Sequence, residues 1–364
     1  MIRLILSDLL AHARVWVGAL AVTAAAGFAA AIAAGMIETG ASYGGEIQEA
    51  MSSTSAAVIM FSGVSALIVL NSTANLSVAL QSRSYALWQL VGIRPSLVGA
   101  VVLVQLGIVG AVGSLGGCLL AIPIFGPLFT WVFREWSQLQ GVHTHLGTLS
   151  VVGVIAAVTV VVLLGGWRGS RRASRTPPIE ALRDPEPPRV RMGWLRWLLT
   201  AATLAGTIGL AAAMNSAMNS ATADSSLSQI SALALFFTPL IASTFAAAGP
   251  LLYPLTLRAW TALLPARAST SWFLARNSAS YRLSQSSAAT GPLMIAIALT
   301  GGLYTTALII GAAIAARTGE NPNVGIAPEG VVLMLGGPLL LSGIAAAATV
   351  FMSGHASMMP ACIV

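Results

Sequence analysis

The side chains that could do chemistry in this chain are few, and their types exclude several classes of protein. All 18 basic residues are Arg, and the sequence contains no Lys. A Walker A loop needs its Lys on the nucleotide phosphates, so the chain cannot be a P-loop ATPase. The long apolar runs hold no acid–base constellation, and they lack the charges that proton- or sodium-driven carriers use. We therefore predict that the chain is not an enzyme and holds no cofactor itself.

Histidine and cysteine side chains give only weak indications of a metal site or a disulfide. His143 and His145 lie two residues apart without a third ligand, which favours a solvated loop over a metal site. Cys118 lies inside an apolar run and Cys362 is third from the end. This placement does not indicate a disulfide framework.

Amides and glycines are notable among the polar and small groups inside the apolar runs. Asn71 and Asn75 lie one helical turn apart on one face of the second run. Amides in hydrocarbon need partners, so this pair either makes interhelical hydrogen bonds or lines a polar path for a headgroup or peptide. Gly113 and Gly117 form a GxxxG spacing in the third run, which predicts close helix packing.

The amino-acid composition indicates that membrane-spanning helices hold these polar and small side chains. Hydrophobic residues make up 56% of the 364 residues and charged residues only 8%, against about 25% charged in soluble domains. The apolar residues gather in runs of about 20 or more, the length that crosses a bilayer as a helix. The sequence therefore predicts an all-α polytopic membrane protein with about eight spans, at residues 15–36, 54–80, 96–123, 149–167, 195–217, 228–256, 287–316 and 329–353.

Arginine placement predicts the orientation of these spans. Sixteen of the 18 Arg fall in the N-terminal segment and in segments 81–95, 168–196 and 257–286, all on one side of the predicted membrane. Because Arg-rich loops stay in the cytoplasm, we expect a cytoplasmic N-terminus in a bacterial cell membrane. Segment 168–193 is also Pro-rich, and we interpret it as a cytoplasmic linker.

The predicted outer loops are short. Segment 37–53 is polar and too small for a folded domain. Segment 124–148 carries Phe125, Phe129, Phe133 and Trp136 at helical spacing. This pattern predicts a helix lying in the outer headgroup region, and a contact with a substrate or partner is the alternative.

One stretch on the predicted cytoplasmic side, "QSRSYALWQLVGIRPSL" at residues 81–97, is too polar to span a bilayer and too apolar for an idle loop. We predict a short helix from Arg83 to Val91, followed by Gly92 in a left-handed conformation, with Pro95 preventing continuation. Its apolar side would lie in the membrane interface or fit a groove on a protein partner. The candidate contact residues are Arg83, Tyr85, Ala86, Leu87, Trp88, Leu90, Val91 and Gly92.

Three segments, in this order and topology, resemble FtsX-like permeases, the MacB-type membrane subunits of ABC transporters. "RSYALWQLVGIRPSLVGAVVLVQLGIVGAVGSLGGCLLAIP" is similar to the family's core signature, and "ASRTPPIEALRDP" to the segment after its fourth span. "SWFLARNSASYRLSQSSAATGPLMIAIALTGGL" resembles the start of the second FtsX unit in actinobacterial members. The resemblance implies a four-span unit at 1–167 with a coupling helix at 83–92, two connecting spans at 194–256, and the start of a second unit at 257–364.

The resemblance implies a permease that takes its energy from elsewhere. Separate ATPase subunits would hold ATP and Mg and move the coupling helix, membrane lipid would surround the spans, and no nucleic acid would take part. Export or extraction of a lipid, peptide or antimicrobial is the leading role. The alternatives are an FtsX-like signalling subunit that regulates a cell-wall enzyme and a membrane scaffold outside the ABC class.

The sequence departs from the family in three places. Ser84 replaces the Glu usual after Arg83, the large extracytoplasmic domain of MacB is missing, and the second unit stops after two spans at "HASMMPACIV". We expect either a truncated ten-span permease or a naturally short member that forms a homodimer to supply two coupling helices. Under truncation, the small residues Gly336, Gly337 and Ala345 to Ala348 would face lipid instead of a helix.

Overall fold

The computed structural model describes residues 13–134, 139, 141–175, 193–219, 225–262, 273, 291–305, 308 and 328–356. Over these residues the regular structure is helical and contains no strand. The helices are α2 (Ala13–Tyr43), α3 (Gly45–Leu80), α4 (Ser82–Leu90), α5 (Pro95–Val132), α6 (Thr148–Arg175), α8 (Trp194–Asn219), α9 (Ser225–Ala262) and α12 (Pro328–Ala356).

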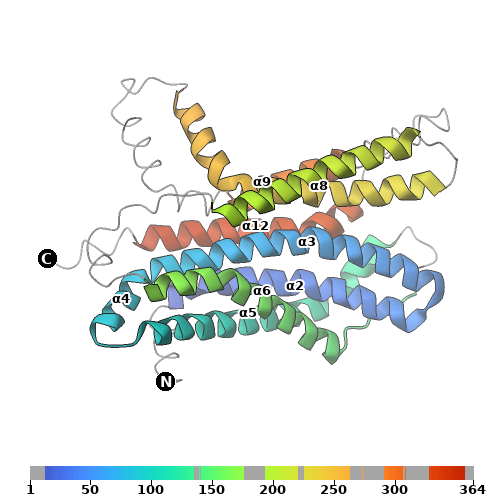
Figure 1. Ribbon diagram of the computed structural model, residues 1–364. Coiled ribbons are helices and arrows are strands. Elements are labelled where there is room, and N and C mark those ends of the chain that lie inside the picture. The colour runs from blue at the N-terminus through green and yellow to red at the C-terminus, as the bar shows by residue number, and fades with distance from the viewer. Residues whose placement is uncertain are drawn as a thin grey trace.

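Six of these helices are long and apolar enough to cross a membrane, which confirms the predicted all-α membrane fold. They are α2, α3, α5, α6, α8 and α12. The other two predicted spans, 228–256 and 287–316, hold the shorter apolar helices Leu235–Gly249 and Gly291–Thr305 within the described residues. In Figure 1 the long helices lie side by side as a bundle, with α4 at one end.

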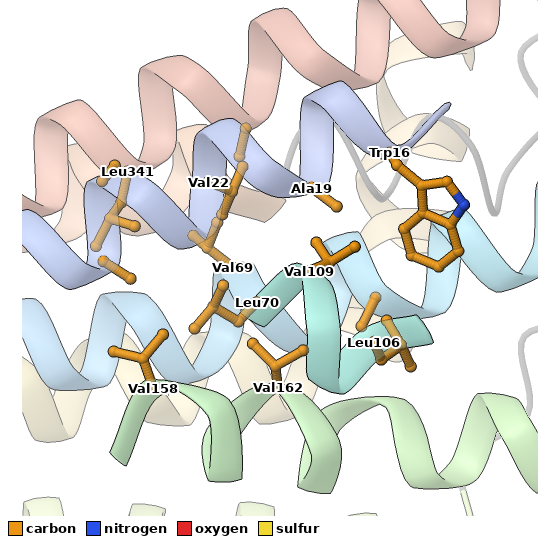
Figure 2. Packing of buried hydrophobic residues seen from close by; sticks show 14 of the residues in the cluster. Trp16, Ala19, Val22, Val69, Leu70, Leu106, Val109, Val158, Val162 and Leu341 are labelled. Atoms are coloured by element: carbon orange, nitrogen blue, oxygen red, sulfur yellow. The ribbon is translucent and has the colours of Figure 1, made fainter. Parts of the chain in front are cut away.

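The centre of the bundle is α2, which packs against α3, α5 and α12. Trp16 and Val22 of α2 are fully buried, and Val69, Leu106 and Leu341 come in from the three neighbours. Figure 2 shows these side chains meeting between the helices. A second cluster joins Phe61 of α3 to α9, Gly291–Thr305 and α12, while α8 packs against α9 at the edge of the bundle.

Small residues permit the closest helix crossings. A Cβ atom placed on Gly113 or Gly117 of α5 would overlap α2, at Thr23 and Ala24 respectively. The GxxxG spacing therefore packs closely against another helix, as predicted from the sequence.

The small-residue face of α12 is packed as well. A Cβ on Gly337 would lie 3.0 Å from the Cβ of Ala29 and 3.2 Å from that of Ser62. Ala345 and Ala348 are also buried. The expectation that the small residues of α12 would face lipid is wrong for Gly337, Ala345 and Ala348, which pack into the bundle, whereas Ala347 is exposed.

Several predicted boundaries are wrong at the end of the bundle away from α4, which we call the far end. Segment 37–53 is not a loop, because α2 continues to Tyr43 and α3 begins at Gly45. The turn between them is made by Gly44 and Gly45, with φ of +71° and +56°, a region that glycine enters without strain.

The interfacial helix predicted in 124–148 is also wrong over its described first part. Helix α5 continues through Pro123 and Pro127 to Val132. Phe125, Phe129 and Phe133 are buried against Met36 of α2 and its neighbours instead of lying in a headgroup layer. Trp136 lies outside the described residues.

An ion pair joins the ends of two long helices, α5 and α12. Arg134, just after α5, forms an ion pair of 2.8 Å with the buried Glu329 in the first turn of α12. Helix α6 extends to Arg175 at its C-terminal end, so the first part of the predicted linker 168–193 is helical. Residues 176–192 of that linker lie outside the described part.

Candidate functional site

The short helix α4 connects α3 to α5 at one end of the bundle (Figure 1). The backbone N–H of Gln81 donates to Val78 O at 3.2 Å, and that of Tyr85 donates to Gln81 O at 3.2 Å. The chain therefore leaves α3 and enters α4 without an intervening loop. The predicted helix at Arg83–Val91 agrees with the observed one, Ser82–Leu90, to within one residue at each end.

The end of α4 is a Schellman motif. Gly92 has a φ of +97°, its N–H donates to Gln89 O at 3.0 Å, and Ile93 N–H donates to Trp88 O at 3.1 Å. These two bonds satisfy carbonyls that the helix end would leave free. Pro95 is then the first residue of α5, where a missing N–H costs nothing. The sequence prediction for Gly92 is confirmed.

The two sides of α4 have different environments. Tyr85 and Ala86 are buried, and Trp88 is half-buried against the main cluster with Ile93. The Tyr85 and Trp88 rings meet edge to face, with centroids 5.7 Å apart. These aromatic residues pack α4 against the bundle and fix its orientation.

The other side of α4 is apolar and open. Leu87, Leu90 and Val91 are 47%, 51% and 85% exposed, and Gly92 is exposed beside them. We call Leu87, Leu90 and Val91 the exposed edge of α4. Of the candidate contact residues, these three and Gly92 are exposed, while Tyr85 and Ala86 face the bundle. The side chain of Arg83 lies outside the described part of the chain.

A buried polar group lies directly behind the exposed edge. The Tyr85 hydroxyl donates to Oε1 of Gln81 and lies 3.5 Å from Oε1 of Gln105 in α5. Gln81 and Gln105 are themselves buried. The two amide oxygens of these side chains thus lie next to one shared hydroxyl in a buried place.

The end of α6 completes this end of the bundle and brings positive charge to it. Helix α4 contacts α6 as well as α3 and α5. The Ser170 hydroxyl of α6 donates to Gly99 O of α5 at 2.8 Å. Arg171 lies over the Trp167 ring at 5.1 Å and remains exposed. The exposed edge of α4 is apolar, and the helix α6 that contacts α4 carries the exposed Arg171 near its end.

The two intramembrane amides meet at the crossing of α3 and α6. The Asn75 amide donates to Asn71 O at 2.7 Å, to Asn71 Oδ1 at 2.9 Å and to Gly165 O of α6 at 3.5 Å. Asn71 itself is exposed on the bundle surface. The bond to Gly165 is interhelical, whereas a role in a polar path stays a prediction.

The two loop histidines belong to a polar cluster at the far end. The Nδ1 atom of His145 lies 3.2 Å from Oε1 of Glu38, and His143 donates its backbone N–H to the Tyr43 hydroxyl at 2.9 Å. Glu38 also accepts Gly147 N–H at 2.8 Å and the Ser150 hydroxyl. No group of three or more metal-binding side chains occurs among the described residues. These contacts attach α2 to the start of α6.

Sequence reasoning missed Gln105 and Glu38 as interaction centres. Gln105 could have been noticed, because it is an isolated amide within the apolar run 96–123. Glu38 gave no such signal, because an acid at the end of a predicted span is an ordinary surface residue. Its partners lie more than 100 positions later in the chain.

Comparison with protein families identifies one match. The family described as FtsX-like permease C-terminal matches residues 55–178, a segment that holds most of α3, all of α4 and α5, and α6. Comparisons with curated proteins and with solved structures found no match. The matched segment supports the FtsX-like relationship, and it includes the candidate site.

Proposed function

We propose that this chain is the membrane subunit of an ABC transporter and that α4 is its coupling helix, on which a separate ATPase subunit docks. The observation that carries this proposal is the exposed edge of α4, within a segment that matches an FtsX-like permease domain. An apolar helix edge that is rooted by buried aromatics is suited to fit a groove on a protein.

The proposal assigns the energy source to the partner. ATP and Mg would be bound by the ATPase subunits, and this chain would be a non-catalytic subunit. Association would press on the exposed edge of α4, a helix that the buried Tyr85 and the half-buried Trp88 hold against the bundle. A second copy of the chain would supply a second coupling helix.

Location and substrate class follow from the same proposal. The chain would be a multi-pass protein of the bacterial cell membrane, with the α4 end and the N-terminus in the cytoplasm. The Arg-rich end of α6 beside α4 supports this orientation. We propose export or extraction of a lipid, peptide or antimicrobial as the role, with an FtsX-like signalling role toward a cell-wall enzyme as the alternative.

Charge substitutions on the exposed edge test the docking. Fully burying one aliphatic side chain contributes about 1.5–3 kcal/mol, so Leu87→Asp or Leu90→Asp should weaken ATPase association about tenfold or more. Leu87→Met and Leu90→Met keep the edge apolar and should bind like the wild type. Unchanged association of both Asp variants would rule out α4 as the docking element. Trp88→Ala should also uncouple the two subunits, but it removes core packing as well.

A further inference from the structure

Three buried side chains link α4 to its two neighbours. Tyr85 is 1% exposed, Gln81 is 4% exposed at the junction between α3 and α4, where it is the N-cap residue of α4, and Gln105 is 0% exposed in α5. The Tyr85 hydroxyl donates to Gln81 Oε1, and Gln105 Oε1 lies 3.5 Å away from it. Tyr85 therefore contacts α5 and the junction through which α3 continues into α4. We call Tyr85, Gln81 and Gln105 the polar joint.

The polar joint is incompletely bonded in this conformation. The Nε2 atom of Gln81 and the Oγ atom of Ser77 are buried and have no hydrogen-bond partner in the described part of the chain. Ser77 lies one turn before Gln81 on the same face of α3. Trp16 Nε1 is also buried and has no partner among the described residues, and Trp16 belongs to the same buried cluster as Tyr85 and Leu106.

Unpaired donors beside a shared hydroxyl allow a second arrangement of the same groups. A buried polar network that is only partly satisfied gains by any rearrangement that pairs its free members. A small displacement of α4 would move the Tyr85 hydroxyl relative to Gln81 and Gln105. Packed elements with two discrete arrangements respond to such a displacement by switching between them.

We propose that the polar joint transmits the displacement of α4 to α3 and α5, with Tyr85 as the positioning residue that exchanges hydrogen bonds between two states. This inference rests on the proposed function, because it needs an ATPase that moves α4. It adds the residues through which the movement travels. Docking uses the exposed edge and transmission uses the buried side, so the two can be disabled separately.

The experiment measures the ATP-dependent movement at the far end of the bundle. Spin labels are placed at Ser53→Cys in α3 and Leu149→Cys in α6, two exposed positions, in a background with Cys118→Ala and Cys362→Ala. The full chain is reconstituted in nanodiscs with the ABC ATPase subunit that co-purifies with it. The distance between the labels is recorded without nucleotide and with ATP and vanadate.

Tyr85→Phe is the key variant, because it removes only the hydroxyl. We expect it to lose at least half of the ATP-dependent distance change while binding the ATPase within twofold of the wild type. Tyr304→Phe is the matched control, because Tyr304 is exposed on Gly291–Thr305 and should move like the wild type. A full ATP-dependent distance change in Tyr85→Phe would refute the proposed role of the polar joint in transmission.

A second variant covers a failure of Tyr85→Phe to fold. Gln105→Met keeps the side-chain length without the acceptor and should lose the distance change to the same extent. The double variant should lose no more than either single variant, because both act through one contact. Additive losses would overturn the inference. Failure of the wild type to bind the ATPase or to move would instead refute the proposed function.

Discussion

The backbone of Gly117 in α5 lies so close to Ala24 of α2 that a Cβ atom on Gly117 would be 2.0 Å from the Ala24 carbonyl oxygen. No side chain fits at this crossing. Helix α5, which belongs to the matched segment, is therefore held against α2 at a spacing that only glycine permits.

Gly117→Ala should separate α5 from α2. Overpacking of this kind costs about 1–3 kcal/mol, and the displaced atoms here are backbone, which cannot rotate away. We expect a lower thermal unfolding midpoint in nanodiscs. Gly116→Ala is the matched control, because a Cβ at Gly116 meets nothing within 4 Å. Equal midpoints for the two variants would show that the crossing is not under this constraint.

Glu38→Ala should loosen the start of α6 at the far end. Glu38 accepts Gly147 N–H at 2.8 Å and contacts His145 and Ser150, so it acts as a cap supplied by another helix. A cap contributes about 1–2 kcal/mol. Hydrogen exchange of the Gly147 amide should therefore rise about tenfold. Glu49→Ala removes an exposed acid at the same end and should leave that rate unchanged; a similar rise in both variants would contradict the cap.

Cysteine labelling tests the orientation that the Arg distribution predicts. With Cys118 and Cys362 replaced, a membrane-impermeant thiol reagent should label Glu46→Cys in intact cells. It should reach Ser174→Cys only after permeabilisation, because the end of α6 lies on the same side as α4. Labelling of Ser174→Cys in intact cells would place α4 outside and exclude contact with a cytoplasmic ATPase.

The sequence predicted helices within the hydrocarbon-length runs, but not how far those helices extend beyond them. Hydropathy does not report helix in the polar segment 37–53, where α2 and α3 continue almost to each other. The spacing of Phe125, Phe129 and Phe133 fits an interfacial helix as well as a core-facing one. Only the position of α2 decides between these interpretations.

The candidate site was predictable only where local sequence signals determine the structure. Gly92 and Pro95 are local signals, so the end of α4 could be placed from the sequence. The division of α4 into a buried and an exposed side could not, because its apolar residues surround most of a short helix. Gln105 is visible as a polar residue in a span, but its contact with Tyr85 depends on how α5 packs against α4.

In the proposed function, the exposed edge of α4 contacts an ABC ATPase. A photo-crosslinking amino acid at position 91, where Val91 is 85% exposed, tests that contact without relying on loss of function. A crosslinker at position 119, where Leu119 is 58% exposed in the middle of α5, is the control for a surface that faces lipid. We predict that illumination links position 91 to the ATPase, with Leu87→Asp abolishing the product, and gives none from position 119. Absence of an ATPase crosslink from position 91, or equal crosslinking from both positions, would contradict the account.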